Sequence, residues 1–575
     1  MKINSIYYII LLCIVQSTIA QTKPADIKTE EVNVVKPFTP TISDAVKIKE
    51  NTPQDDVVLK RSEVLKYTIF SVPVASTFTP NKGVAAKVEP TVVEKLFDNY
   101  ASLAAGNYGI VDALLNVTNN YKNNTYFNAN FKHLSSQGGI KNVNIDNSFF
   151  DTSADVTFGR KTESLSWKLN AGIRNQTYNW YGIDPTIAAQ LVTDQINPKN
   201  TYNSIKFGSQ IQLSESILNE ASLSFLRFTD NYKSAENRLV VQPKMALKVL
   251  DQEIAVNFGL DYLQGSFLNE NLGLNTIKYG FTNLAFQPSF NIKKDDFTAN
   301  IGLSMVYSVA TEADKNKFYF YPNATASYKI VGDLMIGFAG LEGGLIQNSY
   351  HDFMQINNFV APNLLIVPTD KKFNIYAGLR GKLSTAIAYD AQVSIINEDY
   401  KPLFKNSTYN YNSISNVGFA FGNSFEIIYD TVKTVAVSGE ITANFSENVA
   451  FTVHGIFSKY VLSNQDEPWN LPNLEISSNL DFKIIEKWNA GFKIFYVGER
   501  KDQFTQVSNT AFYLPITKTL QGYFDLNAYV NFNLNSKLGF FVKGNNLANQ
   551  NYQRWINYPV QGIQLLLGAH YKFDF

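Results

Sequence analysis

The chain of 575 residues has little cysteine, little histidine and no excess of either charge sign. It contains one Cys and four His, and its 50 Lys and Arg residues equal its 50 Asp and Glu residues. A nucleic-acid binder needs a basic excess for its phosphate contacts, so we expect no nucleic-acid partner. No run of about 18 apolar residues follows the first 20 positions, which argues against membrane-spanning helices. The 32 Tyr and 42 Phe instead favour a protein of many strands.

The N-terminus has the pattern of an export signal. The apolar stretch Ile6–Val15 follows a basic second residue, and Thr18 and Ala20 supply the small residues expected before a cleavage site. We therefore predict a secretory signal peptide at residues 1–20. The only Cys lies inside it, so the exported chain has no disulfide to stabilise it.

Residues 21–98 differ from the rest of the chain in their proline content. They hold seven of the 19 prolines and a charged stretch from Lys47 to Lys66. This composition is typical of an extended segment with no packed core of its own. We predict a Pro-rich N-terminal segment that lies in the periplasm or in the lumen of the domain that follows.

From residue 99 to residue 575 the pattern is strict alternation. In Ile563–Phe575 one face is wholly apolar or aromatic and the other is polar, with Leu566 as the lone apolar exception. Phe524–Leu534 and Ile205–Leu213 repeat the pattern. Such strands are 10 to 15 residues long, which suits a tilted strand crossing a bilayer, about 9–11 residues, better than a globular sheet. Polar residues such as Lys132, Lys206, Asp525, Lys572 and Asp574 would then face an enclosed interior.

The spacing of turns predicts the architecture. Short polar turns alternate with longer connections, the asymmetry of outer-membrane barrels, whose short side is periplasmic and whose long loops are extracellular. We predict an all-β fold, a transmembrane antiparallel β-barrel of about 22 strands over residues 99–575. A β-propeller would show repeated blade signatures, and none is visible. The predicted short turns lie at Asn123, Thr162, Glu215, Gln252, Asp295, Gly332, Thr385, Glu447, Lys487 and Ser536, and the long connections include Tyr178–Asn200, Ser349–Lys371, Asp399–Asn412 and Lys501–Lys518.

The strand count depends on two assumptions. Phe421–Phe445 must be one long strand, and Ala101–Tyr121 must be the opening pair. With both, ten short turns separate eleven strand pairs.

We find no catalytic or metal-binding constellation in the sequence. The four His residues are scattered, without the spacing of metal ligands, and neither a phosphate-binding loop nor a nucleophile elbow is present. We therefore expect no enzyme, no catalytic residues, no bound metal and no cofactor.

Two aromatic segments are the candidate contact sites. They place large rings beside amides, an arrangement that could stack a sugar, a planar chelate or a partner surface. The alternative is the girdle of aromatic residues that membrane barrels place at the bilayer interface. The candidate residues are Tyr178, Trp180, Tyr181, Tyr552, Arg554 and Trp555.

The C-terminal segment carries a family resemblance. The stretch from Asn546 through Leu547 and Asn549 to Tyr552, followed by the Pro-Val-Gln-Gly turn after Tyr558, resembles the C-terminus of TonB-dependent receptors. The Pro-rich stretch 358–369 looks like a mid-barrel loop of that family, and 22 strands is that family's barrel. The terminal aromatics are similar to the closing signal read by the outer-membrane assembly machinery. That signal comprises Tyr571, Phe573 and Phe575.

The resemblance implies an outer-membrane location in a Gram-negative cell, with lipid as the surrounding partner. Family members carry a folded plug, whereas too little chain precedes the first strand here, so the plug is missing or much reduced and coupling to TonB is in doubt. The lumen of so wide a barrel needs a filler: the N-terminal segment, inward-folded loops, or another outer-membrane or periplasmic protein. We expect passage of a polar solute through the lumen. The alternative is a non-transporting subunit that scaffolds a larger complex for assembly, secretion or surface-protein handling.

Overall fold

A computed structural model describes residues 96–575, apart from 122, 186–195, 215, 250–251, 269–275, 409–416 and 508–512. Every described residue lies in one compact unit, residues 91–575. The predictions for residues 1–20 and 21–95 therefore lie outside the described residues. Within the described part, no helix has both the length and the apolar character needed to cross a bilayer.

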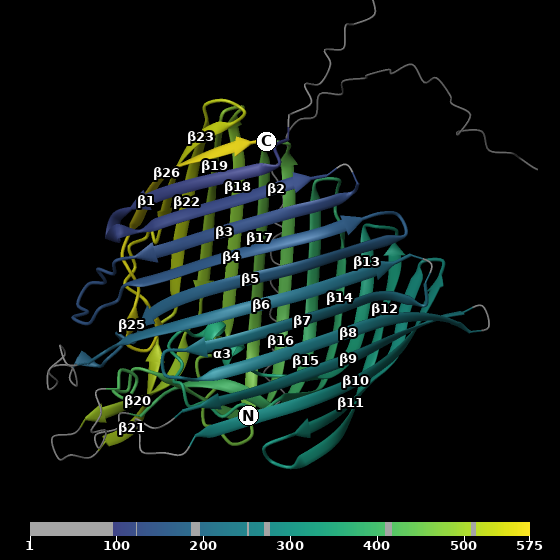
Figure 1. Ribbon diagram of the computed structural model, residues 1–575, viewed down its shortest axis with the longest axis horizontal. Coiled ribbons are helices and arrows are strands. Elements are labelled where there is room, and N and C mark those ends of the chain that lie inside the picture. Colours follow the sequence, from purple (N-terminus) through teal and green to yellow (C-terminus); the bar gives the residue numbers. More distant parts are fainter. Residues whose placement is uncertain are drawn as a thin grey trace, which may run out of the picture. The chain divides into compact units, whose positions relative to one another are not determined.

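The described chain forms one antiparallel sheet of 22 strands that closes on itself (Figure 1). Closure is made by the first and last strands, which pair from Asn99 opposite Phe573 to Gly106 opposite Leu566. The strands are β1 (Asn99–Gly106), β2 (Val111–Asn120), β3 (Thr125–Ser136), β4 (Phe149–Lys161), β5 (Leu165–Asn179), β6 (Lys199–Leu213), β7 (Leu218–Asp230), β8 (Ala235–Val249), β9 (Gln252–Phe267), β10 (Ile277–Lys294), β11 (Phe297–Ala310), β12 (Lys315–Val331), β13 (Met335–Ile346), β14 (Thr369–Lys382), β15 (Ile387–Asn406), β16 (Phe425–Ser446), β17 (Val449–Leu462), β18 (Leu474–Ile485), β19 (Trp488–Val497), β22 (Tyr523–Asn533), β23 (Leu538–Asn545) and β26 (Gln564–Phe573).

This architecture confirms the predicted barrel and its strand count. The ten predicted short turns fall at or beside the short connections between paired strands, although residue 215 itself lies outside the described residues. The opening pair is present as β1 and β2, joined by the single-turn 3-10 helix η3 (Asn107–Gly109). The long strand β16 begins at Phe425 rather than at the predicted Phe421. The preceding residues belong to a loop, because the Asn423 side chain donates to the carbonyls of Trp180 and Gly418, each at 2.7 Å.

The alternation of side chains assigns the two faces of the wall. In β26, Leu565 and Leu567 are 52% and 68% exposed, whereas Leu566 and His570 are almost fully buried. Closed backbone pairing with apolar side chains outside is what a lipid environment requires. Leu566, the exception in the sequence pattern, lies on the inner face, where it joins a buried cluster with Ala104, Ile110 and Phe541.

The segment Lys501–Lys518, predicted to be a long connection between barrel strands, forms a β-hairpin outside the barrel sheet. Its strands β20 (Arg500–Val507) and β21 (Tyr513–Leu520) pair with each other in a separate sheet. Asp502 attaches the hairpin to the barrel, because its fully buried carboxylate accepts from the backbone N–H of Asn406 at 2.9 Å. The predicted long connection is confirmed, but its hairpin was not predicted, because the contact that orders the hairpin is far away in the sequence.

The attachment of this hairpin should depend on pH. Burial raises the pKa of Asp502 from 3.8 to about 7. The folded state therefore binds more protons than the unfolded state between about pH 4 and 7, and the stability from this group falls as pH rises through that window. We expect the amide of Asn406, corrected for intrinsic exchange, to be better protected from hydrogen exchange at pH 5.5 than at pH 8. Asp502→Asn keeps an acceptor oxygen and should abolish the difference; an unchanged difference would contradict this assignment.

Candidate functional site: the outer mouth of the barrel

The long loops fold together at the barrel end opposite the short turns. They form one buried apolar cluster, which we call the mouth cluster, with contributions from strands on several sides of the barrel. Burial of so many rings removes a large apolar area from water, at roughly 25 cal/mol per Å². The loops thus narrow the outer mouth with packed side chains. The members of the mouth cluster are Tyr202, Phe228, Leu263, Phe267, Tyr279, Tyr350, Phe353, Met354, Val360, Leu364, Ile366, Phe404, Phe425, Ile427, Leu520, Trp555, Ile556 and Tyr558.

Tyr558 joins several of these loops. It lies in the short strand β25 (Tyr558–Pro559), which pairs with β24 (Gln553–Trp555) in the last long loop. Its ring stacks on Phe359 with centroids 3.8 Å apart and meets Tyr181 edge-on at 4.8 Å. Its hydroxyl donates to the carbonyl of Asn423, and its burial raises its pKa well above the usual value. Tyr558 therefore connects four segments that are distant in sequence.

A glycine makes room for this ring. A Cβ added at Gly182 would lie 2.2 Å from a ring carbon of Tyr558, a distance that real side chains do not tolerate. The close approach of Tyr558 to the loop after Tyr181 therefore requires glycine at this position.

The loop 347–368, which we call the lumen loop, connects β13 to β14 and contains the helix α3 (Tyr350–Ile356). Figure 1 shows α3 at the end of the barrel away from the C-terminus. Ser349 caps the helix by accepting from the N–H of Asp352 at 3.0 Å. Tyr350, Phe353 and Met354 face the mouth cluster and are buried.

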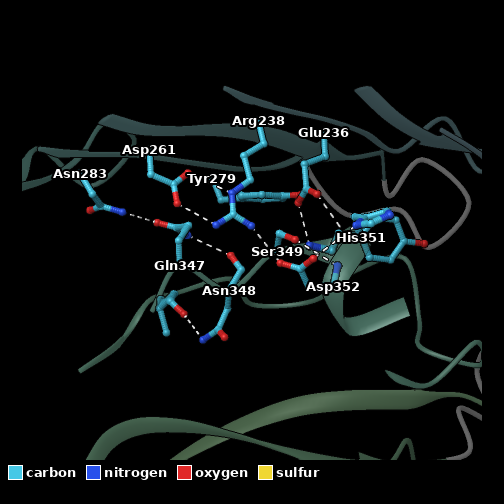
Figure 2. A network of polar contacts seen from close by, with 12 residues as sticks. Glu236, Arg238, Asp261, Tyr279, Asn283, Gln347, Asn348, Ser349, His351 and Asp352 are labelled. Atoms are coloured by element: carbon cyan, nitrogen blue, oxygen red, sulfur yellow. Dashed lines mark hydrogen bonds and ion pairs between the residues drawn. The ribbon is translucent and has the colours of Figure 1, made fainter. Parts of the chain in front are cut away.

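Polar side chains of the barrel wall hold the start of α3 (Figure 2). Glu236 of β8 is fully buried and accepts from the backbone N–H groups of Tyr350 and His351, at 2.7 and 3.1 Å. The hydroxyl of Tyr279 donates to the same carboxylate at 2.8 Å. A carboxylate buried away from water needs hydrogen-bond donors, and Glu236 has three of them. In return, Glu236 accepts from two backbone N–H groups in the first turn of α3.

Arg238 is the second wall contact of the lumen loop (Figure 2). It donates in a two-pronged pair to Asp261 of β9, at 2.9 and 2.7 Å, and to Asp352 of α3 at 2.9 Å. Burial opposes the charge on Asp352, but bonds with His351 and Ser349 and the charge of Arg238 lower its pKa. We call Glu236, Arg238, Asp261 and Asp352 the latch, because their side chains join the lumen loop to the wall.

Four of the six predicted contact residues lie around one cavity of about 440 Å³, which we call the mouth cavity. Tyr178 and Tyr181 line it from β5 and the loop after β5, and Arg554 and Trp555 line it from the last long loop. The structure thus brings together two segments that are far apart in the sequence. Whether they bind a ligand stays a prediction.

The other two predicted residues lie elsewhere. Trp180 is 1% exposed, packs against Tyr232 and Phe419, and donates from Nε1 to the carbonyl of Phe359 at 3.1 Å. It is therefore a core residue of the loops and is not part of a lipid-facing girdle. Tyr552 stacks on Tyr523 at 3.9 Å and donates to Asp525 on the wall at 2.7 Å.

The predicted closing signal lies at the end of β26. Tyr571 and Phe573 stack with centroids 5.8 Å apart, and Phe575 is 87% exposed beyond the strand. Recognition of these side chains by the assembly machinery stays a prediction.

Sequence reasoning missed the latch. Part of the latch could have been found from the sequence, because Glu236 and Arg238 are two residues apart in an alternating strand and therefore lie on the same face of it. The partner from α3 could not be found this way, because it lies more than 100 positions later. Among the described residues, no group of three or more His, Cys, Asp or Glu is placed to hold a metal ion.

Comparison with known proteins identifies the fold. No family model and no curated protein matches the chain. Solved structures do match, among them the siderophore receptor PirA from Acinetobacter baumannii, with TM-score 0.62 and 11% identity over 83% of this chain and 80% of that chain. The fold is that of a TonB-dependent receptor barrel.

Two further receptor barrels give the same result. The ferripyoverdine receptor of the outer membrane of Pseudomonas aeruginosa has TM-score 0.61 and 11% identity, over 83% of this chain and 72% of that one. The ferric-catecholate import receptor Fiu from E. coli K12 has TM-score 0.60 and 12% identity, over 84% and 82%. All three of these similar proteins are described as receptors, and none of them is described as an enzyme. An outer-membrane location agrees with this fold and with the apolar outer face.

Proposed function

We propose that this protein admits a small polar solute across the outer membrane, and that the lumen loop is the gate. The observation that carries the proposal is that the outer mouth is narrowed by a loop that the latch side chains and one backbone bridge, from Val360 to Phe425 of β16, hold beside a polar and charged wall. Release of this loop breaks that bridge but none of the pairings between neighbouring strands of the barrel.

The inner wall supports passage of a polar solute. Lys132, Lys206 and Arg174 line a second cavity of about 470 Å³ together with Asp112 and Asp155, and we call it the wall cavity. Charges of both signs on a wetted wall are typical of barrels whose interior carries polar solutes. Lys543 also pairs with Asp112 at 3.2 Å.

The latch supports a gating role for the lumen loop. Removing one partner of a buried ion pair costs roughly 3–5 kcal/mol, and less where water reaches the charges. The side chains of Arg238 and Asp261 are 21% and 23% exposed, so this pair is partly reached by water. The latch is thus strong enough to hold a closed state and weak enough to release.

The scaffold alternative depended on the missing energy-coupling module and on the need for something to block the lumen. The loops themselves narrow the outer end, which weakens the second of these two reasons. Solute passage is therefore the better supported function.

Conductance in planar bilayers tests the proposal. Arg238→Gln leaves the carboxylates of Asp261 and Asp352 without their cation, so we expect this variant to spend more time open than the wild type. Arg227→Gln is the matched control, because Arg227 lies on the neighbouring strand and bonds Asn237 at 3.0 Å, away from the latch. If the wild type and both variants stay electrically silent, solute passage is contradicted.

A further inference from the structure

The mouth cavity has a lining with a distinct chemistry. Its residues are mainly aromatic rings and side-chain amides, with two guanidinium groups and no carboxylate. A volume of about 440 Å³ lies in the range of small-molecule sites. We propose that this cavity binds a small anionic, hydroxyl-rich solute of the acidic-sugar class, and this role as the admitted solute rests on the function proposed above.

The charge of the cavity favours an anion. Arg174 is neutralised by Asp151, to which it donates from Nε at 2.8 Å and also from a terminal nitrogen. Arg554 is exposed and has no ion-pair partner among the described residues, although its carbonyl accepts from Arg500. Within the described part of the chain, Arg554 is therefore a cation at the cavity that no carboxylate neutralises. A guanidinium binds a carboxylate through two parallel bonds, which neither an amide nor a ring can supply.

The neutral part of the lining suits hydroxyl groups. A side-chain amide carries both a donor and an acceptor, which matches a hydroxyl that can do either, although the amide of Gln176 already bonds Asp151, Tyr178 and Gln355. The Oδ1 of Asn179, a residue 3% exposed, has no partner among the described residues. The rings of Tyr178, Tyr181 and Trp555 supply flat apolar faces for the C–H face of a sugar ring.

The same cavity lies against the gate. Gln355 and Phe359 of the lumen loop are part of its lining. Arg174 donates to Gln355 at 3.2 Å, and Gln355 donates to Gln176 at 3.3 Å, so these bonds join the loop to β5. A bound solute that takes over these bonds would weaken the loop's attachment to the wall. A ligand that binds the released state better than the closed one shifts the gate toward release.

Arg174 also connects the mouth cavity to a second cavity farther along the inner wall of the barrel. It lines both the mouth cavity and the wall cavity, so the two share a residue. In the wall cavity, Lys132 and Lys206 have no ion-pair partner among the described residues and can contact an anion, although Asp112, Asp151 and Asp155 line the same cavity.

Binding of sodium D-glucuronate to the full detergent-solubilised chain tests the inference by titration calorimetry. We expect saturable binding, at least tenfold weaker binding of D-glucose, and about a tenfold loss in Arg554→Gln. Arg554→Lys should restore part of the affinity, and Arg227→Gln, which removes the same charge outside the cavity, should leave it unchanged. Folding of each variant is checked by heat-dependent gel mobility.

The outcomes separate this inference from the proposed function. Absent glucuronate binding, equal affinity for glucose, or an unaffected Arg554→Gln variant overturns the ligand assignment, even if Arg238→Gln conducts. Binding with the expected pattern in a barrel that never conducts upholds the site and removes solute passage instead.

Discussion

Replacing Tyr558 by alanine should open the outer mouth more than any other single substitution in the loops. The change removes a ring that contacts Phe359 and Tyr181, together with the hydroxyl bond to Asn423. Truncating a buried aromatic side chain to alanine costs roughly 3–5 kcal/mol. This energy holds loops and not the barrel sheet, so we expect the barrel to fold while the mouth cluster loosens. Higher bilayer conductance and faster proteolysis of the loops are the expected measurements.

Two controls separate the ring from its surroundings. Tyr558→Phe keeps the stacking on Phe359 and loses only the hydroxyl bond, so it should have a smaller effect. Tyr552→Ala removes an aromatic side chain from the same loop, but one that packs on Tyr523 at the wall. If Tyr552→Ala opens the barrel as much as Tyr558→Ala does, Tyr558 has no special role in closing the mouth.

The local pattern of the sequence was enough to predict the wall. Side chains alternate across a strand, so the apolar and polar faces of β6 and β26 could be assigned from residue types alone. Turn residues such as Asp295 and Gly332, which have positive φ of 49° each, mark connections that need no distant partner. Strand and turn signals of this kind depend only on neighbouring positions.

The positions of the long loops could be predicted from the sequence, but their folded conformations could not, because these depend on contacts between residues that are far apart in the sequence. The hairpin β20–β21 depends on Asp502 meeting Asn406, 96 positions away, and the mouth cavity depends on Tyr181 meeting Tyr558. The aromatic character of both segments was visible, and it marked them as candidates. Their meeting at one cavity was not visible, since no periodicity connects two loops.

The second large effect is expected from placing a charge on the lipid-facing side of the barrel wall. Phe207 of β6 is 52% exposed on the outer face, whereas Gln210 of the same strand lies on the inner face and donates to Glu220 at 2.9 Å. An arginine on the lipid face near the bilayer midplane costs about 2–4 kcal/mol, because the charge loses water and gains no partner. Phe207→Arg should therefore lower the free energy of unfolding in lipid vesicles by about that amount.

The matched substitution Gln210→Arg places the same charge inside, beside a carboxylate, and should change the stability little. Urea titration of both variants in phosphatidylcholine vesicles, followed by tryptophan fluorescence, measures the difference. Equal losses of stability for the two variants would mean that β6 does not separate lipid from lumen, and this would contradict the proposed gate and the proposed solute site as parts of a membrane channel. A loss of stability confined to Phe207→Arg supports the assignment of a lipid-facing outer side and a polar inner side, on which both proposals depend.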